Sequence, residues 1–338
     1  MDKEIQGIIA SIDKQYGQGS LVNLGGEQIY NIERCPSGSL LLDLALGGGY
    51  PQGRVIELFG KESGGKTTAA LFYIAELQKT LPDKYVAFVD AEFSLDIELA
   101  RRYGVDVGKL LISQPSSGEE ALNIMESLAR SGKFSGIVVD SVSALVPQAE
   151  AESEMEQQSI GLQARMMSKA LRKLTSVASN YACSMVFINQ IREKVGVMYG
   201  NPETTSGGKA LKFYSSIRIE VRPGEPIKKG DEQIGHVMNC KVVKNKTYPP
   251  FKKASFALIY GEGIDRVADI GKIALDIGLV KLAGSWISVL DENGEVRPAK
   301  VGEEGDLMKW QGKDKFFNYL RDDGELLEEL ESKIRDQG

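Results

Sequence analysis

The chain has 338 residues, 42% apolar and 26% charged, a balance typical of a globular protein and unlike that of a disordered or collagen-like chain. At this length we expect one large domain with smaller appendages. The formal net charge of -6 excludes a uniformly basic surface, so nucleic-acid binding would require lysines and arginines gathered locally.

Cysteine, histidine and long apolar segments are scarce. The three cysteines, Cys35, Cys183 and Cys240, are widely spaced, which favours buried free thiols over disulfides or a zinc site. The one histidine, His236, leaves little room for a Ser-His-Asp hydrolase, so proton transfer should rest on carboxylates or lysines. No apolar run reaches membrane-spanning length, and the N-terminus lacks the basic start of a signal peptide, so we expect a cytoplasmic protein without a membrane partner.

In chain order, residues 5–16 show a helical apolar pattern, and the glycine-rich stretch 17–28 predicts a linker. From about residue 36 to residue 263, short apolar runs alternate with helical patterns, which predicts strands and crossover helices in a mostly parallel sheet. Strands are predicted at 55–59, 85–90, 136–140, 184–189, 215–222 and 239–246, and helices at 67–81, 118–130 and 161–174.

Beyond residue 264 the pattern changes to a helix over 267–280, a strand-like segment over 284–296 with a turn at Asn293-Gly294, and a helical acidic C-terminus. We therefore predict an α/β fold in three parts. These are a small N-terminal helical arm (1–31), a core with a mostly parallel central sheet (32–264), and a small α+β domain with a short acidic tail (265–338).

Residues 60–67, GKESGGKT, match the pattern Gly-x-x-x-x-Gly-Lys-Thr. In this motif backbone amides cradle phosphates, the lysine (Lys66) reaches the β and γ groups, and the hydroxyl (Thr67) holds magnesium. A buried strand is predicted before the motif and a helix that ends at Pro82 after it, which places the loop at a helix N-terminus where anions bind. The motif predicts an ATP site.

Three further strands end in polar residues. Asp140 ends one strand, as expected of the second carboxylate of a magnesium site. Asp90 and Glu92 end another, and one of them could polarise an attacking water, the alternative being a simple strand-end cap. Asn189-Gln190 ends the third, where a neutral amide could sense the γ-phosphate. Ligands of open α/β sheets bind at this edge, so the four strand ends together predict one site.

A basic stripe lies on the helix predicted at 161–174. Arg165, Lys169, Arg172 and Lys173 are spaced to share one face, which is either a solvated face or a binding surface. Residues 196–208 contain four glycines and one proline without periodicity, and loops this long are commonly functional. Basic residues flank this loop on both sides: Arg192, Lys194, Lys209 and Lys212.

The same loop region carries apolar residues that cannot all enter the core: Val195, Val197, Met198 and Tyr199. Leaving them in water costs free energy, so a partner with hydrophobic faces, such as unstacked bases, is a reasonable inference. Single-stranded nucleic acid is held by positive grooves and stacking side chains without regard to sequence. The alternative is a flexible lid over the nucleotide.

At this point the chain resembles the bacterial RecA recombinase family, chromosomal or phage-encoded, from about residue 15 to about residue 286. The stretches that carry the resemblance are GKESGGKTT, DAEFSLD, IVVDSVSALVP, GLQARMMSKALRKL, FINQIREKVGVMYGNPETTSGGKALKFY, KVVKNK and YGEGID. The resemblance implies a RecA-type P-loop ATPase core with two DNA-binding loops. It also implies an ATP- and Mg²⁺-dependent helical filament on single-stranded DNA that exchanges strands with homologous double-stranded DNA in recombination, repair and the SOS response to DNA damage.

The resemblance also implies residue roles at the nucleotide. Glu92 would activate water, Gln190 would report the γ-phosphate to the loop, and Thr67 and Asp140 would serve the magnesium site. Lys244 and Lys246 would reach a neighbour's ATP across a subunit interface, and Tyr260 would approach adenine from the adjacent subunit. The nucleotide-binding set is Gly60, Glu62, Ser63, Gly64, Gly65, Lys66, Thr67, Thr68, Asp96 and Tyr260.

For DNA, the family pattern points to the following residues: Ile160, Arg165, Ser168, Lys169, Arg172, Arg192, Lys194, Val195, Gly207, Gly208 and Lys209. The N-terminal arm would dock on the next protomer, the C-terminal domain would capture duplex DNA, and a self-cleaving repressor is a further candidate partner. The chain departs from the family pattern at Lys61, Gly64, Phe93 and Leu99, which bears on adenine selectivity and turnover. It also departs at Lys209, which should strengthen DNA contact slightly.

Two other functions share these motifs. One is a ring-shaped helicase or translocase on a related core, and the other is a protein that coats single-stranded DNA with ATP as a switch. The N-terminal arm favours an open filament over a ring, because a heterologous contact that does not close generates a helix. Glu92 argues against a pure switch, which needs no poised carboxylate.

Overall fold

The computed structural model describes residues 2–17, 20–21, 32–153, 161–193, 203–300 and 305–337. It divides into two compact units, Met1–Glu33 and Arg34–Gly338. In the first unit, α1 (Lys3–Tyr16) begins where the Asp2 carboxylate accepts a hydrogen bond from the Glu4 amide. Ile5 and Ile8 of this helix are exposed. The helix predicted at 5–16 is therefore confirmed, and its apolar side is uncovered in the isolated unit.

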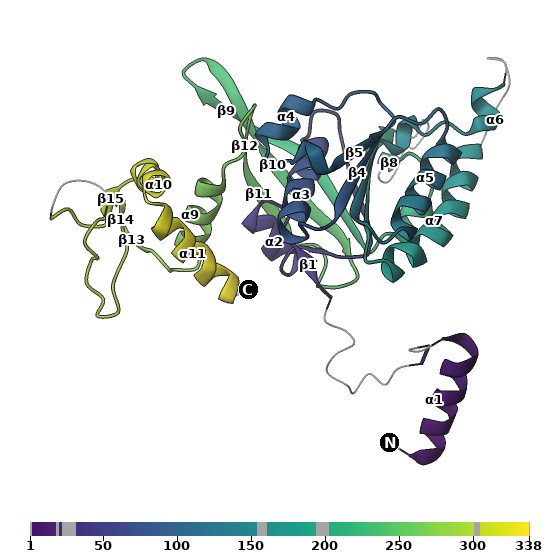
Figure 1. The fold of residues 1–338 in the computed structure, drawn as a ribbon. Helices are drawn as coiled ribbons and strands as arrows, with labels where there is room; N and C mark the ends of the chain where they lie inside the picture. The colour runs from purple at the N-terminus through teal and green to yellow at the C-terminus, as the bar shows by residue number, and fades with distance from the viewer. Residues whose placement is uncertain are drawn as a thin grey trace. The chain divides into compact units, whose positions relative to one another are not determined.

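A ten-stranded sheet among the described residues forms the centre of the second unit (Figure 1). Its order is β12-β11-β10-β9-β3-β7-β6-β4-β5, with β8 paired to β7. The strands are β3 (Val55–Gly60), β4 (Tyr85–Asp90), β5 (Leu110–Ser113), β6 (Phe134–Asp140), β7 (Ser184–Glu193), β8 (Glu203–Thr205), β9 (Ile217–Lys229), β10 (Glu232–Asn245), β11 (Lys253–Ile259) and β12 (Gly263–Ile264). Strands β9, β3, β7, β6, β4 and β5 run parallel, so the predicted mostly parallel α/β sheet is confirmed.

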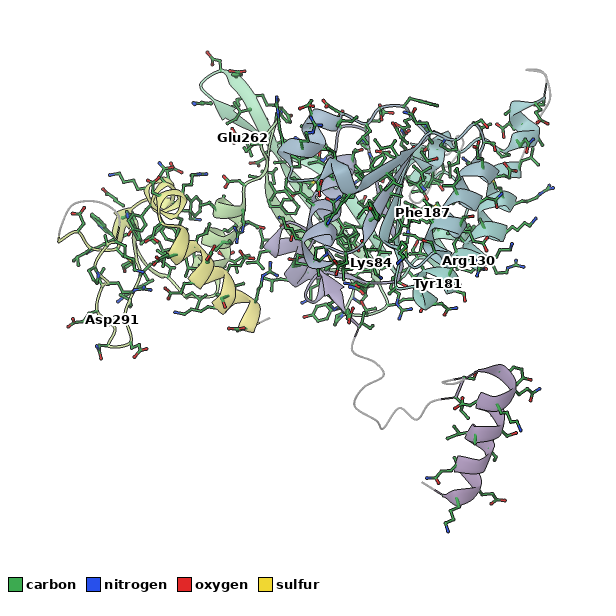
Figure 2. All side chains as sticks on the ribbon, in the orientation of Figure 1. Lys84, Arg130, Tyr181, Phe187, Glu262 and Asp291 are labelled. Carbon is green, nitrogen blue, oxygen red and sulfur yellow. The ribbon has the colours of Figure 1, made fainter. Side chains whose placement is uncertain are left out.

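Helices cover both faces of this sheet. They are α2 (Leu40–Leu46), α3 (Lys66–Thr80), α4 (Ile97–Arg102), α5 (Gly118–Arg130), α7 (Leu162–Asn180) and α8 (Ala210–Tyr214), with short 3₁₀ turns at Val107–Lys109 and Val142–Ala144. The short helix α6 (Gln148–Ala151) buries none of its residues and lies away from the sheet (Figure 1). Neighbouring residues of one strand enter opposite cores: Val186 of β7 joins the cluster that contains α3, and Phe187 joins the cluster of α5 and α7 (Figure 2). This two-sided burial explains the continuous apolar runs of the parallel strands.

The remaining elements are smaller. Strands β1 (Arg34–Cys35) and β2 (Tyr50–Pro51) form a separate pair, and β13 (Lys281–Ala283), β14 (Trp286–Ser288) and β15 (Lys309–Gln311) form a three-stranded antiparallel sheet. Helices α9 (Arg266–Asp276), α10 (Lys313–Asp322) and α11 (Gly324–Gln337) pack with that sheet around a third core cluster, which also includes Leu40 of α2. The division at residue 264/265 stays a prediction.

Several sequence expectations can be compared directly. The three cysteines are buried free thiols, as expected. The turn at Asn293-Gly294 is confirmed, because Leu290 and Val296 form an antiparallel bridge around it. Strands β9 and β10 are longer than predicted and project as a hairpin (Figure 1). Within the described residues, none of the helices combines the length and apolar character needed to cross a membrane.

A buried carboxylate joins the sheet-bearing core to the C-terminal helices. Asp269 of α9 accepts hydrogen bonds through Oδ2 from the Ser39 hydroxyl (2.7 Å) and the Leu41 amide (3.3 Å). Its other oxygen, Oδ1, is buried without a partner in the described structure. The pKa of Asp269 is raised to about 6, mainly by burial and to a smaller extent by the nearby Asp43 carboxylate, while the hydrogen bonds from Ser39 and Leu41 act in the opposite direction.

Asp269→Asn should stabilise the protein more at pH 8 than at pH 5. The folded-state pKa of Asp269 lies above the ordinary value of 3.8, so its contribution to stability is complete below that value and is lost as pH rises through about 6. Asparagine removes the cost of the buried charge, on the order of 2 kcal/mol. Thermal melting at both pH values checks this, with Asp276→Asn, an exposed site on the same helix, as control. The same change in Tm at both pH values would contradict the assignment.

Candidate functional site

The phosphate-loop motif connects β3 to α3, and two of its glycines are required by close packing. A Cβ atom at Gly60 would lie 1.9 Å from the Val221 carbonyl oxygen. Gly65 has a φ of 89° and leaves only 2.7 Å from an added Cβ to Met238 Sδ. The loop is therefore pressed against β9 and β10, with its backbone open at the N-terminus of α3.

Lys66 is the first residue of α3 and is buried. Its ammonium donates to the Lys61 carbonyl oxygen at 2.6 Å. Burial lowers the pKa of Lys66, while the carboxylates of Asp140 and Glu92 act in the opposite direction. A partly desolvated cation held at the loop by one carbonyl is well placed to bind phosphate oxygens instead.

Thr67 and Asp140 meet at the ends of α3 and β6. The Thr67 hydroxyl donates to Asp140 Oδ2 at 2.6 Å, and burial raises the pKa of Asp140 to about 6. A hydroxyl oxygen and a carboxylate are the oxygen donors that Mg²⁺ prefers, and this ion commonly takes its other ligands from substrate phosphates and water. These two residues fit a magnesium ion at the phosphate loop.

The two carboxylates at the end of β4 have different environments in the structure. Asp90 is buried and accepts from the Ser94 amide (3.1 Å) and the Leu95 amide (3.3 Å), so it organises the turn. Glu92 is exposed, and its Oε1 accepts from the Ser141 hydroxyl and from Gln190 Nε2, the latter at 3.1 Å. Of the two, Glu92 is the one positioned to act on a water molecule.

The sequence did not decide which of the two adjacent side-chain amides, Asn189 or Gln190, faces the nucleotide, and the structure distinguishes them. The Asn189 side chain is fully buried and bonded to Glu57 and to the Ser206 carbonyl oxygen, each at 3.0 Å. Gln190 is only partly buried and reaches Glu92. Gln190 is therefore the amide that faces the nucleotide side of the sheet.

A cavity of about 400 Å³ opens beside the phosphate loop. Its lining comprises Ser63, Gly64, Gly65, Lys66, Thr67, Thr68, Leu99, Tyr103, His236, Leu258, Tyr260 and Gly261. Within this chain Tyr260 lines the cavity at its own phosphate loop, and the expectation that it approaches adenine from the adjacent subunit stays a prediction. Pairing of β10 with β11 brings the end of β11 against the phosphate loop of the same chain, where Leu258 Cδ2 would lie 3.2 Å from a Cβ at Gly65.

Other predicted nucleotide residues lie near the cavity in different ways. Asp96 caps α4 by accepting from the Leu99 amide at 3.0 Å, and it is not part of the cavity lining. Glu62 is exposed on the loop. Tyr103 and His236 were not predicted as site residues, since neither belongs to a motif and only the fold brings them to the loop. The Tyr260 hydroxyl contacts His236 Nδ1 at 3.3 Å.

Lys244 has a partner within its own chain. Its ammonium donates to the carbonyl oxygens of Lys212 (2.7 Å) and Phe213 (3.0 Å) at the C-terminal end of α8. Burial, followed by the charges of Lys246 and Arg218, lowers the pKa of Lys244 to about 8. The side chain of Lys246 is exposed.

The basic stripe of α7 divides in two. Arg165, Lys169 and Lys173 line a groove between α5 and α7, opposite Glu119 and Glu126 of α5. Ser168 and Arg172 instead follow Ala164 at intervals of four residues, so the three side chains form one row. A Cβ at Gly208 would lie 2.8 Å from Ala164 Cβ, so this row begins beside the end of the predicted loop.

The segment after the predicted loop is anchored to α7. The Gly207 amide donates to Gln163 Oε1 at 3.1 Å, and the Gln163 amide nitrogen donates to the carbonyl oxygens of Val142 and Leu145. Arg192 on β7 and Lys209 beside α8 are exposed. Ile160, Lys194 and Val195 lie outside the described residues, so no position is assigned to them.

Comparison with known proteins agrees with this geometry. A family model for the RecA N-terminal domain matches residues 3–265. Protein RecA of Thermus aquaticus is 52% identical over 334 residues, which cover 98% of this chain and 93% of that protein. Protein RecA of Ruminococcus albus is 50% identical over 98% of this chain and 80% of its own length, and that of Clostridium novyi (strain NT) is 49% identical over 99% and 91%.

This extent of sequence similarity shows that the α/β core with its phosphate loop belongs to a family of known function. RecA proteins are DNA-dependent ATPases that use ATP with Mg²⁺, bind DNA and form filaments. The chain belongs to the RecA family and is an ATP-dependent recombinase that assembles on single-stranded DNA and exchanges strands with homologous duplex DNA.

Proposed function

We propose that ATP is hydrolysed at the edge where β3, β4, β6 and β7 end, and that DNA held along α7 and residues 206–209 controls the reaction. The observation that carries the proposal is the meeting of Glu92 with Gln190 at 3.1 Å, next to the Thr67–Asp140 pair. Gln190 lies six residues before the predicted loop at 196–208, so a residue at the catalytic carboxylate is also close in sequence to the DNA side.

In this proposal the phosphate loop binds the triphosphate through backbone amides from residues 63–68, and Lys66 exchanges the Lys61 carbonyl for phosphate oxygens. Thr67 and Asp140 would hold Mg²⁺, which would neutralise charge on the phosphates. Glu92 orients the attacking water and takes up its proton. Both donors contact Oε1 of Glu92, so Oε2 is the oxygen that we assign to the water.

The proposed DNA surface is built from the row of Ser168 and Arg172 with the amides of Gly207 and Gly208, which would hold phosphates without regard to base sequence. The Gly207 amide would have to exchange Gln163 Oε1 for a phosphate oxygen. Arg165, Lys169, Arg192 and Lys209 add positive charge around this row. Ile160, Lys194 and Val195 complete the proposed surface from sequence alone.

Assembly supplies the remaining proposed roles. The exposed apolar side of α1 would dock on the next protomer, as an arm formed by residues 1–31. Lys244 and Lys246 would act on a neighbour's ATP, for which Lys244 would have to leave the end of α8. Residues 265–338 would capture duplex DNA, and the filament, acting in the cytoplasm, would stimulate a self-cleaving repressor.

Lys66→Ala should lower ATP hydrolysis by about 100-fold or more, both with and without single-stranded DNA, because no other group replaces the ammonium at the phosphates. The matched control is Lys61→Ala, which keeps the backbone carbonyl that Lys66 contacts and removes only an exposed side chain. Steady-state phosphate release measures both variants. Normal DNA-stimulated hydrolysis by Lys66→Ala would refute the nucleotide site.

Arg172→Ala should weaken binding to single-stranded DNA and reduce the slope of log K against log salt by about one, as expected for the loss of one phosphate contact. Lys173→Ala removes the same charge from the next residue, whose side chain lines the α5–α7 groove, and should leave the slope unchanged. Fluorescence anisotropy over a salt series compares them. Equal slopes for the two variants would show that the division of the stripe has no role in DNA binding.

A further inference from the structure

Asn189 makes three hydrogen bonds through one buried carboxamide. Its Nδ2 donates to Glu57 Oε1 and to the Ser206 carbonyl oxygen, each at 3.0 Å, and its Oδ1 accepts from the Gln190 amide at 2.9 Å. The side chain is fully buried. Because both ends of the amide are engaged, Asn189 cannot rotate without leaving a buried polar group unpaired.

One of the three partners is itself fixed. Glu57 on β3 is fully buried, and its second oxygen, Oε2, accepts from Arg218 Nε of β9. The Arg218 guanidinium also lies 4.5 Å from the centre of the Phe59 ring. A buried ion pair is costly to break, so Glu57 holds the Asn189 amide against the central strands of the sheet.

The other two partners are Gln190, at the nucleotide site, and Ser206, beside the proposed DNA surface. Gln190, bonded through its backbone, places its side chain against Glu92 at 3.1 Å. Ser206, bonded through its carbonyl oxygen, contacts the Ser143 hydroxyl at 3.2 Å and precedes Gly207, which is held by Gln163 of α7. The covalent path between them runs through residues 191–205, whereas Asn189 joins them through one side chain.

We infer that Asn189 is the positioning residue that couples the nucleotide state to DNA affinity. When Gln190 exchanges Glu92 for the terminal phosphate, its backbone amide shifts, and Asn189 transmits the shift to the carbonyl of Ser206. From there it reaches Gly207 and Gly208, of which Gly208 lies against Ala164 of α7. Glu57 and Arg218 are the fixed side of this linkage. The inference rests on the proposed function of the site and adds the residue through which its two halves communicate.

The test measures coupling directly. Binding of a fluorescein-labelled oligothymidylate is titrated in the presence of a slowly hydrolysed ATP analogue and in the presence of ADP, and the ratio of the two dissociation constants is the coupling factor. The wild type should bind more tightly with the ATP analogue, and Asn189→Ala should reduce the ratio by about tenfold or more. A residue needed only for stability would weaken binding in both nucleotides and leave the ratio unchanged.

The matched control is Asn239→Ala, which removes a carboxamide bonded to the Ser255 hydroxyl on the antiparallel part of the same sheet. Its ratio should equal that of the wild type. If Asn189→Ala does not fold, Asn189→Ser, which retains a hydroxyl able to donate to only one of the two acceptors, should give a lowered ratio. A wild-type ratio in the folded variant overturns the inference alone. A wild type that binds DNA equally with both nucleotides overturns the proposed function as well.

Discussion

The common edge at which the parallel strands end is the constraint on which the rest of the structure depends. Parallel pairing aligns Gly60 of β3 with Gln190 of β7, and Asp90 of β4 with Asp140 of β6. Strand-end residues that are far apart in the chain therefore lie side by side at one edge of the sheet, because strand pairing alone aligns them. The phosphate loop, the Thr67–Asp140 pair and the Glu92–Gln190 contact all follow from this alignment.

Burial gives this edge its electrostatic character. It raises the pKa of Asp140 and lowers that of Lys66, so both charged groups lack part of the solvation that water would provide. Phosphates and a divalent cation would supply the missing interactions. The same principle operates at Asp269, where no ligand is involved and the buried charge is instead expected to cost stability.

Much of this arrangement was predictable from the sequence, because it depends on local patterns. Buried strands appear as apolar runs, the motif at 60–67 fixes the loop chemistry, and the polar residue at the end of each strand marks the binding edge. What the sequence left open depends on tertiary packing. Only the turn after β4 shows that Asp90 is structural and Glu92 is not, and only the pairing of β10 with β11 brings Tyr260 to its own phosphate loop. The spacing of Arg165, Lys169 and Arg172 gave one face of a helix, but the position of α5 divides that face.

The most direct test of the account concerns Glu92, the carboxylate at which the nucleotide and DNA sides meet. Hydrolysis of ATP and binding of ATP and single-stranded DNA would be measured in parallel for the wild type and Glu92→Gln, which keeps the shape of the side chain and removes its basicity. The account predicts that the variant binds both ligands but hydrolyses ATP at least about 100-fold more slowly, with no stimulation by DNA. Normal DNA-stimulated hydrolysis by Glu92→Gln would contradict it.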